Sequence, residues 1–340
     1  MIAKVLQTAL KKVRLFASDK FDLANNVLIY GENKKLTLSC CDGNSGIVET
    51  VNITGSSIDM NCCVDVYKFS KFIEAVNDDE DLNIFINKKE QLVIEGSNFK
   101  SYLDTMSPNR MFNIPKPQKW QIVDLDFVNE IKIISDTENL DPEIPIINSD
   151  EYLYYANPKA CVMLKTKYPD IQFMVTKKFL KKIIIDDFRK VSIENGQFYL
   201  GNDNCEIFIP LFAGNKIKLL PILNKLNELH IHTLFIDAVE FKYITKLFTS
   251  EYESNDFDVI SVSIDQEKIR FQSGYSEIET KKIVYEGPNV NFKIPKYSLT
   301  VGSKEYFKTN ELIKFKIADP MTMFVVTGND IIYFNGTKRT

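Results

Sequence analysis

Histidine is nearly absent from this chain of 340 residues, which contains only His230 and His232. General acid–base catalysis uses histidine more often than any other side chain, so this scarcity argues against that kind of enzyme. The sequence also has no P-loop, no G-x-G-x-x-G and no G-x-S-x-G motif. We therefore predict a protein that has no catalytic activity and uses no cofactor.

Long apolar runs are also missing, because no stretch approaches the roughly 18 residues that a membrane span needs. The first residues, Met1 to Lys4, show no secretory pattern. We therefore expect a cytoplasmic protein whose thiols are reduced.

The cysteines lack the spacing of a metal site: none occurs as C-x-x-C, and only two histidines could complete a zinc site. We therefore predict no metal. Adjacent residues of a strand point to opposite faces, so one cysteine of each adjacent pair is expected in the core. The six are Cys40, Cys41, Cys62, Cys63, Cys161 and Cys205.

A short module occurs three times, in Val64–Ile73, Phe173–Ile183 and Phe292–Leu299. Each copy has an apolar strand end, a lysine beside an aromatic or aliphatic residue, and a short helix. The copies lie about 110 to 120 residues apart, which is the size of a domain. We predict three similar domains, over residues 1–115, 116–225 and 226–340. Repetition of whole domains indicates ring closure, as in a clamp around DNA.

Each third of the chain shows the same order of elements: a helix, about four alternating strands, a second helix and about three strands. This order predicts an α+β fold. Two linkers separate the thirds, over Ser107–Lys119 and Gly214–Thr233, and the second contains both histidines. The predicted helices span 3–17, 68–76, 124–134, 177–185, 238–248 and 296–307.

Positive charge is concentrated on these helices. Counted with their flanking residues, over 3–17, 67–77, 124–134, 176–187, 237–249 and 296–309, they carry an excess of about seven lysines and arginines over acidic residues, although the chain as a whole has a net charge of −4. Lysines on a helix can simply form its solvated face, but six helices with a shared bias favour contact with phosphates. The predicted DNA-binding residues are Lys11, Lys12, Arg14, Lys68, Lys71, Lys177, Lys178, Lys181, Lys182, Lys242, Lys246, Lys304 and Lys308.

The architecture resembles that of the bacterial DNA sliding clamp, the beta subunit of the replicative DNA polymerase III. Val64–Phe69 and the hairpin Asn87–Lys100 carry the local likeness. The resemblance implies two chains closed head to tail into a ring, with helices inside and sheets outside. It also implies double-stranded DNA, a DNA polymerase and a clamp loader as partners.

Two segments depart from that family. Asn157–Val162 stands where the family has Thr-Asp-Gly-His-Arg-Leu, and Gly214–Leu220 stands where it has Asp-Gly-Arg-Phe-Pro-Asp-Tyr. Both belong to the family's pocket for partner peptides, so we expect a different partner motif. A clamp from a phage or another mobile replicon fits this pattern.

The resemblance implies a partner-peptide pocket that is mainly apolar. These side chains could instead fill an ordinary core between domains. The implied pocket residues are Tyr155, Val162, Pro221, Ile222, Leu223, Leu226, Ile332 and Phe334.

Alternatives stay open at this point. Tyr152–Tyr155 could stack on single-stranded bases or form a strand. Asp78–Asp81, Asp186-Asp187 and Asp256–Asp258 could bind a cation or form solvated turns. The rival functions are a monomeric DNA-associated processivity factor, a β-rich structural or assembly protein, and a carboxylate-based hydrolase.

Overall fold

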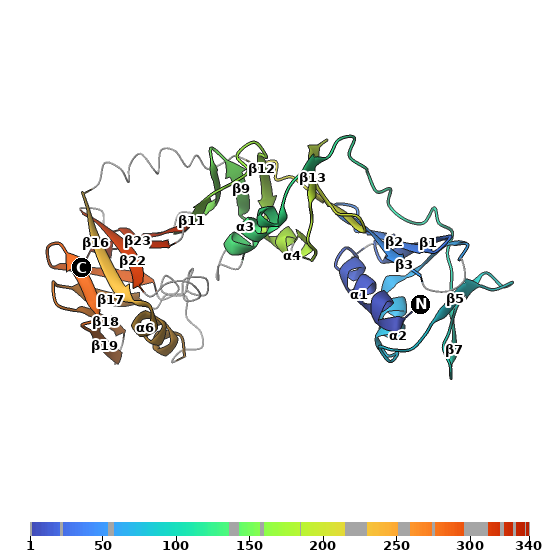
Figure 1. Ribbon diagram of the computed structural model, residues 1–340, viewed down its shortest axis with the longest axis horizontal. Coiled ribbons are helices and arrows are strands. Elements are labelled where there is room, and N and C mark those ends of the chain that lie inside the picture. The colour runs from blue at the N-terminus through green and yellow to red at the C-terminus, as the bar shows by residue number, and fades with distance from the viewer. Residues whose placement is uncertain are drawn as a thin grey trace. The chain divides into compact units, whose positions relative to one another are not determined.

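The computed structural model describes residues 2–20, 23–53, 58–135, 143–156, 160–183, 185–214, 230–250, 259–273, 276–295, 312–319, 323–328, 331–336 and 338–339. These residues form an α+β fold, as predicted. The chain divides into two compact units (Figure 1). Unit 1 comprises Met1–Val128 and Phe179–Leu211, and unit 2 comprises Asn129–Lys178 and Phe212–Thr340.

Unit 1 contains an eight-stranded sheet in the order β4-β1-β2-β3-β15-β14-β13-β8 and a three-stranded sheet in the order β5-β6-β7. The helices of this part are α1 (Ala3–Arg14), α2 (Val66–Glu74), α4 (Leu180–Ile183) and the start of α3 (Leu125–Ser135). The strands are β1 (Asn26–Glu32), β2 (Lys35–Cys41), β3 (Gly46–Asn52), β4 (Met60–Asp65), β5 (Asn83–Ile86), β6 (Gln91–Glu95), β7 (Lys100–Asp104), β8 (Gln121–Ile122), β13 (Lys190–Glu194), β14 (Gln197–Gly201) and β15 (Cys205–Pro210).

Unit 2 contains a nine-stranded sheet in the order β12-β9-β10-β11-β24-β23-β22-β16-β20 and a five-stranded sheet in the order β19-β18-β17-β21-β25. Its long helix is α6 (Ala238–Ser250), and the 3-10 turn η1 (Lys177–Phe179) precedes α4. The strands are β9 (Pro145–Ser149), β10 (Tyr152–Ala156), β11 (Ala160–Lys165), β12 (Phe173–Thr176), β16 (His230–Asp237), β17 (Val259–Ile264), β18 (Ile269–Ser273), β19 (Ser276–Thr280), β20 (Ile283–Glu286), β21 (Val290–Pro295), β22 (Leu312–Asp319), β23 (Met323–Gly328), β24 (Ile331–Gly336) and β25 (Lys338–Arg339).

Helices α1 and α2 pack against each other beside the eight-stranded sheet (Figure 1). Leu6, Leu10 and Val13 recur at helical spacing in α1 and are fully buried. The Gln7 side chain donates hydrogen bonds to the carbonyl groups of Ile73 and Val76, at the end of α2. A buried polar contact therefore fixes the register of the two helices in addition to apolar packing.

Strands that lie far apart in the sequence join each large sheet. In unit 1, β3 pairs antiparallel with β15, and in unit 2, β11 pairs antiparallel with β24. We call these two pairings the first and the second junction. We call the strands before and after the second helix of a predicted domain its first and second half. In both junctions, the third strand of a first half pairs with the last strand of the second half of another domain.

A second feature also recurs through the chain. The segment after the last strand of each predicted domain returns to pair with an earlier strand. Met106 forms an isolated antiparallel β-bridge with Cys63, and the amide of Phe212 donates a hydrogen bond to the carbonyl of Met174. In the last domain, β25 pairs with β21. These equivalent positions support the repeat that the sequence indicated, while the exact domain boundaries stay predictions.

The cysteines differ from expectation, because both members of each adjacent pair are buried. The predicted linker 107–119 explains this. Phe112, Ile114 and Trp120 cover Cys41, and the sulfur of Cys63 lies 3.8 Å from the carbonyl oxygen of Pro108. Both faces of the sheet are therefore covered at these positions. Burial raises the pKa of Cys62 to about 12 and that of Cys63 to about 11.

One expectation from the sequence needs correction, and one open alternative is decided. His230 and His232 do not lie in a linker: β16 begins at His230 and pairs with β22 along its whole length. Tyr154 and Tyr155 are both completely buried, so neither can stack on a base. Burial raises the pKa of Tyr154 to about 12. Tyr152–Tyr155 therefore form a strand that is covered on both faces.

Candidate functional site

Part of the predicted DNA-binding surface lies on α1 and α2. We define the α1–α2 basic surface as Lys11, Arg14, Lys68 and Lys71, which are all exposed. Among the described residues, Lys11, Lys68 and Lys71 form no ion pair. Their charges are therefore available for a partner.

Arg14 connects the two helices of this surface. Its Nη1 lies 3.2 Å from Oε1 of Glu74, and its guanidinium lies 5.7 Å from the centre of the Tyr67 ring. The helix cap of α2 adds order, since Asp65 Oδ1 accepts a hydrogen bond of 2.9 Å from the amide of Lys68. The surface is therefore held in a fixed arrangement.

Lys12 does not belong to this exposed surface, contrary to expectation. Its Nζ lies 2.9 Å from Oε1 of Glu49 and also contacts Asp186. Burial by itself lowers the pKa of Lys12, but hydrogen bonds to Asp186 and Glu49 outweigh burial and raise it to about 12. Lys12 thus joins α1 to β3 and to the segment before β13, and its charge is already neutralised.

Glu49, Asp186 and Cys205 lie close enough together to suggest a metal site. The ammonium group of Lys12 already supplies the positive charge between the two carboxylates. Burial raises the pKa of the Cys205 thiol, which keeps it protonated and makes it a poor metal ligand. The donor set therefore fits an internal ion pair better than a metal ion.

Lys182 also differs from the prediction of a DNA-binding residue, because its side chain is only 14% exposed. Its Nζ lies 2.8 Å from Oδ2 of Asp42 and 2.6 Å from Oγ of Ser45. The same ammonium group lies over the rings of Phe16 and Phe179. Lys182 stabilises the packing of unit 1 and does not face solvent.

The neighbouring lysines have other environments. Lys178 is exposed and lies 3.1 Å from Glu143, whereas Lys177 is half-buried. The side chain of Lys181 lies outside the described residues. The four lysines around α4 therefore do not form the single solvated cluster that the sequence predicted.

Helix α6 presents a basic face in unit 2. Lys242 and Lys246 are exposed on it, and so are Val239 and Tyr243. These four residues recur at helical spacing, which places them on one side of α6. The opposite side packs against β16 and β22 through the buried side chains of Phe241 and Ile244. Lys304 and Lys308 lie outside the described residues.

The predicted peptide pocket is only partly described. Tyr155 and Val162 are cross-strand partners and are both fully buried. The register places Ile332 opposite Met163 and Phe334 opposite Cys161, whereas Val162 lies opposite Tyr333. Pro221, Ile222, Leu223 and Leu226 lie outside the described residues. The pocket therefore stays a prediction.

The turns that are rich in acidic residues have internal partners where the structure describes them. Asp186 contacts Lys12, and Asp78 lies 3.7 Å from Lys4. Glu80 accepts hydrogen bonds from Ser97, and these bonds lower its pKa. Asp256 and Asp258 lie outside the described residues. The other turns bind neighbouring side chains and backbone, as structural turns do.

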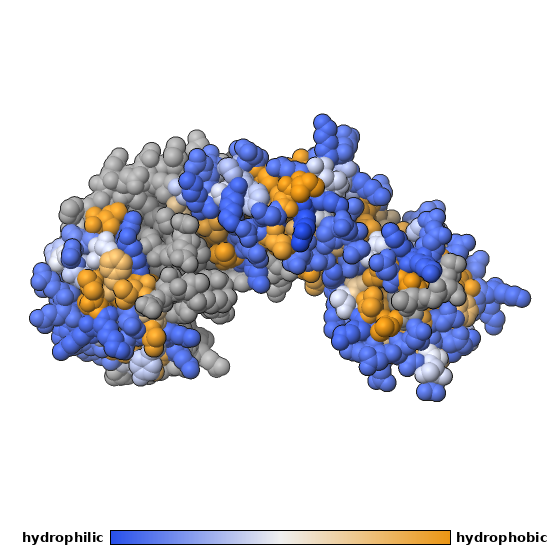
Figure 2. Space-filling view, viewed as in Figure 1, coloured by the Kyte–Doolittle hydropathy of each residue, from blue (hydrophilic) through white to orange (hydrophobic). Residues whose placement is uncertain are grey.

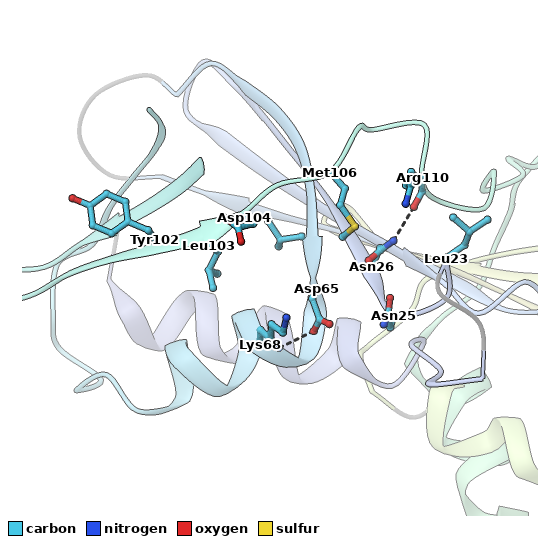
Figure 3. Close-up of a pocket in the computed structure, with 11 residues that line it drawn as sticks. Leu23, Asn25, Asn26, Asp65, Lys68, Tyr102, Leu103, Asp104, Met106 and Arg110 are labelled. Atoms are coloured by element: carbon cyan, nitrogen blue, oxygen red, sulfur yellow. Dashed lines mark hydrogen bonds between the residues drawn. The ribbon is translucent and has the colours of Figure 1, made fainter. Parts of the chain in front are cut away.

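A cleft of about 490 Å³ opens beside α2, β7 and the segment that follows β7 (Figure 3). Lys68 and Arg110 line it together with Asp65 and Asp104, so its charges balance. Asn26 Nδ2 donates a hydrogen bond of 3.0 Å to the carbonyl of Arg110, which fixes the segment above the cleft. No histidine or cysteine lines the cleft.

Figure 2 shows that hydrophilic side chains dominate the described part of the face in view, with smaller hydrophobic areas between them. Among the described helices, none combines the length and apolarity that crossing a bilayer requires.

The whole chain has the fold of the bacterial DNA sliding clamps. No protein-family model matches the sequence, and no curated protein matches it either. The structural likeness is nevertheless complete in length.

The DNA polymerase III subunit beta from Pseudomonas aeruginosa superposes with a TM-score of 0.83 at 13% identity, over 100% of this chain and 99% of that one. A sliding clamp from the same organism, bound to griselimycin, gives 0.85 at 12% identity, over 100% and 98%. The sliding clamp from Caulobacter crescentus gives 0.82 at 11% identity, over 100% and 99%. At such low identity the likeness establishes the fold.

Proposed function

We propose that this protein is a DNA polymerase processivity factor, a sliding clamp that encircles duplex DNA and tethers a replicative polymerase. The observation that carries the proposal is the match of the entire chain to clamp structures, with TM-scores of 0.82 to 0.85. The clamp acts without catalysis, and a clamp loader places it on DNA.

The way the sheets are built supports ring closure. Each junction joins the third strand of one half to the last strand of another, and among the described residues two strands in equivalent positions have no such partner. These are β7, at the edge of the three-stranded sheet, and β19, at the edge of the five-stranded sheet. Two copies joined head to tail satisfy both edges, which closes a ring. Closure would also remove two edges that favour aggregation.

Contact with DNA is assigned to the exposed lysines and arginine of the helices. These side chains are long, flexible cations that suit phosphate contacts, and they belong to the α1–α2 basic surface and to Lys242 and Lys246 of α6. Such contacts do not depend on base sequence, as sliding requires. The acidic remainder of the chain disfavours binding elsewhere on the surface.

The test reverses three charges of the α1–α2 basic surface, with Lys11, Lys68 and Lys71 changed to Glu. The matched control changes Lys34, Lys35 and Lys88 to Glu, because these exposed lysines lie in turns of the same unit or, for Lys35, at the first strand position after a turn. We expect the first variant alone to lose duplex affinity and processive synthesis. Its salt dependence should be shallower by about 0.9 per lost phosphate contact.

Equal loss in both variants would indicate a general charge effect and contradict the assignment. Retained processivity in a folded helix variant would place the DNA surface elsewhere. Unfolding curves for both variants serve as the folding control.

The partner-peptide site is proposed at the residues that the resemblance implies, with Leu223 and Phe334 as anchors. The experiment titrates the C-terminal peptide of the cognate polymerase against the parent and against a Leu223→Asp, Phe334→Asp double variant. We expect at least a tenfold weaker complex, because a carboxylate in an apolar pocket is desolvated without a partner. Unchanged affinity in a folded variant would move the site.

A further inference from the structure

We infer that β7 of one copy pairs antiparallel with β19 of a second copy in one defined register, with Ser101 opposite Ile278. This inference rests on the proposed ring and specifies how it closes. It follows from the two junctions within the chain, whose registers obey a common rule.

The first junction contains a row of four partners that crosses the sheet. Cys40 pairs with Ile47, Ile47 pairs with Ile207, and Ile207 pairs with Leu200. On each side of the junction, the two partners within one hairpin lie seven positions apart in the sequence.

The second junction contains the same row. Tyr155 pairs with Val162, Val162 pairs with Tyr333, and Tyr333 pairs with Val326. The hairpin partners again lie seven positions apart on both sides. Two junctions built from different sequences therefore share one register.

The open edges contain both halves of a third row. Phe271 pairs with Ile278 in the hairpin of β18 and β19, and Ile94 pairs with Ser101 in the hairpin of β6 and β7. Each pair lies seven positions apart. Applying the rule to these halves places Ile278 of one copy opposite Ser101 of the other.

Burial agrees with this register. Phe271 and Ile94 are completely buried, whereas Ile278 and Ser101 are only half-buried. In the first junction all four members of the row are buried. In the third row, Phe271 and Ile94 are therefore already buried, whereas Ile278 and Ser101 would become buried only when the two edge strands pair. A shift by one residue would pair the half-buried face of one strand with the exposed face of the other.

Charge agrees as well. The register places Glu279 opposite Lys100 and Glu277 opposite Tyr102, and all four are exposed on these edge strands. Within the chain Lys100 also pairs with Glu95, and Glu279 pairs with Lys268 and Arg270, so the pairing would join two existing charge pairs across the edge. Opposite charges that face each other across strands stabilise antiparallel pairing. Pairing of β19 with another β19 would instead bring glutamates together. The exposed tyrosine, at 53%, gains a neighbouring strand.

Cysteine cross-linking tests the register directly, because all six native cysteines are buried. One variant carries Ser101→Cys and Ile278→Cys, which the inferred register makes direct partners. Directly opposed residues have Cα atoms about 4.5 to 5.5 Å apart, within the range of a disulfide. The control carries Ser101→Cys and Ser276→Cys, which are offset by two residues and too distant to bridge. The single Ser101→Cys variant reports pairing of β7 with itself.

We expect mild oxidation to convert the first variant into a covalent dimer that a reductant reverses, while the control and the single variant stay uncross-linked. Native mass spectrometry of the parent runs alongside. If the parent is dimeric but the control variant cross-links, or the first variant does not, the register is wrong and the ring still stands. A parent that is monomeric at high micromolar concentration overturns both the ring and the register. Efficient cross-linking of the single variant also overturns the inference.

A charge variant adds a second measurement. Lys100→Glu should raise the dimer dissociation constant about two- to fivefold, whereas Lys88→Glu, in the turn of the same sheet, should leave it unchanged. Equal dissociation constants for the parent and Lys100→Glu would contradict the predicted pairing with Glu279.

Discussion

Replacing Lys12 with methionine should destabilise unit 1 through Glu49. The Glu49 side chain is 7% exposed, and its Oε2 atom has no hydrogen-bond partner among the described residues. Lys12 lies 2.9 Å from its other oxygen and is the cation that neutralises it. Methionine preserves the apolar stem of the lysine and removes the charge.

The magnitude has an upper limit. Breaking a buried ion pair costs about 3 to 5 kcal/mol, because one charge stays buried without a counter-ion. We therefore expect a loss of about 3 kcal/mol at pH 7.

Urea unfolding followed by tryptophan fluorescence measures this loss. Trp120 is the sole tryptophan and packs in unit 1 against Cys41, Tyr199 and Phe208. Lys11→Met, on the exposed face of the same helix, serves as the control and should change stability by less than about 0.5 kcal/mol.

A second change should partly reverse the first. Lys12→Met combined with Glu49→Gln removes the charges of Lys12 and Glu49 and leaves only the more exposed carboxylate of Asp186, so it should recover part of the lost stability. A loss smaller than about 1 kcal/mol in the single variant, or no recovery in the double variant, would refute the assignment of Lys12 as the counter-ion of Glu49.

Three further predictions concern other contacts. Asp42→Asn keeps an oxygen that can accept the hydrogen bond from the Ser45 amide but removes the negative charge that faces Lys182. We expect the free energy of unfolding at pH 7, measured by urea titration, to fall by about 2 kcal/mol. Although burial alone would raise the pKa of Asp42, the hydrogen bond and charge of Lys182 lower it, so this stability is present above the unfolded pKa and is lost as pH falls through the folded one. The stability of the variant should therefore depend less on pH below about pH 4, and identical acid profiles would contradict the pair. Asn148→Ala removes hydrogen bonds to the carbonyls of Tyr168 and Ile171 and should cost about 2 kcal/mol in thermal unfolding, with no effect expected if water replaces the amide. Gly46→Ala would place a Cβ 2.4 Å from the Phe208 ring, so the first junction should weaken by about 1 to 3 kcal/mol in urea unfolding; an unchanged curve would mean that the ring moves aside freely.

The fold could be predicted from sequence because its elements are strongly periodic. The predicted helix 238–248 corresponds to α6, Ala238–Ser250, and the predicted helix 68–76 corresponds to α2 with an offset of two residues. The strand β16 was missed, because a histidine at its start and the nearby second linker obscured its alternation. Burial of both Cys40 and Cys41 could not be predicted, since it depends on Trp120 and its neighbours folding back over the sheet.

The site was less predictable than the fold. Periodicity identified Lys11, Lys68 and Lys71 as exposed, because each lies on the polar side of its own helix. Lys12 and Lys182 obey the same local pattern, yet their counter-ions Glu49 and Asp42 lie far away in the sequence. Only tertiary packing brings these charges together. The shared register of the two junctions was also beyond the sequence, because it is a property of paired strands.

The junction of β3 and β15 has a consequence during synthesis. At about 5 to 20 residues per second, a ribosome needs roughly 8 to 30 seconds to produce the 150 or so residues between the two strands. For that time the edge of β3 is complete but uncovered, and an uncovered edge recruits other chains. Glu49 points from this strand toward the core. An inward charge on a waiting edge discourages wrong partners, and the native partner strand arrives together with Asp186, which completes the charge pairing with Lys12. The buried ion pair is therefore completed only when the native partner strand β15 and Asp186 have been synthesised.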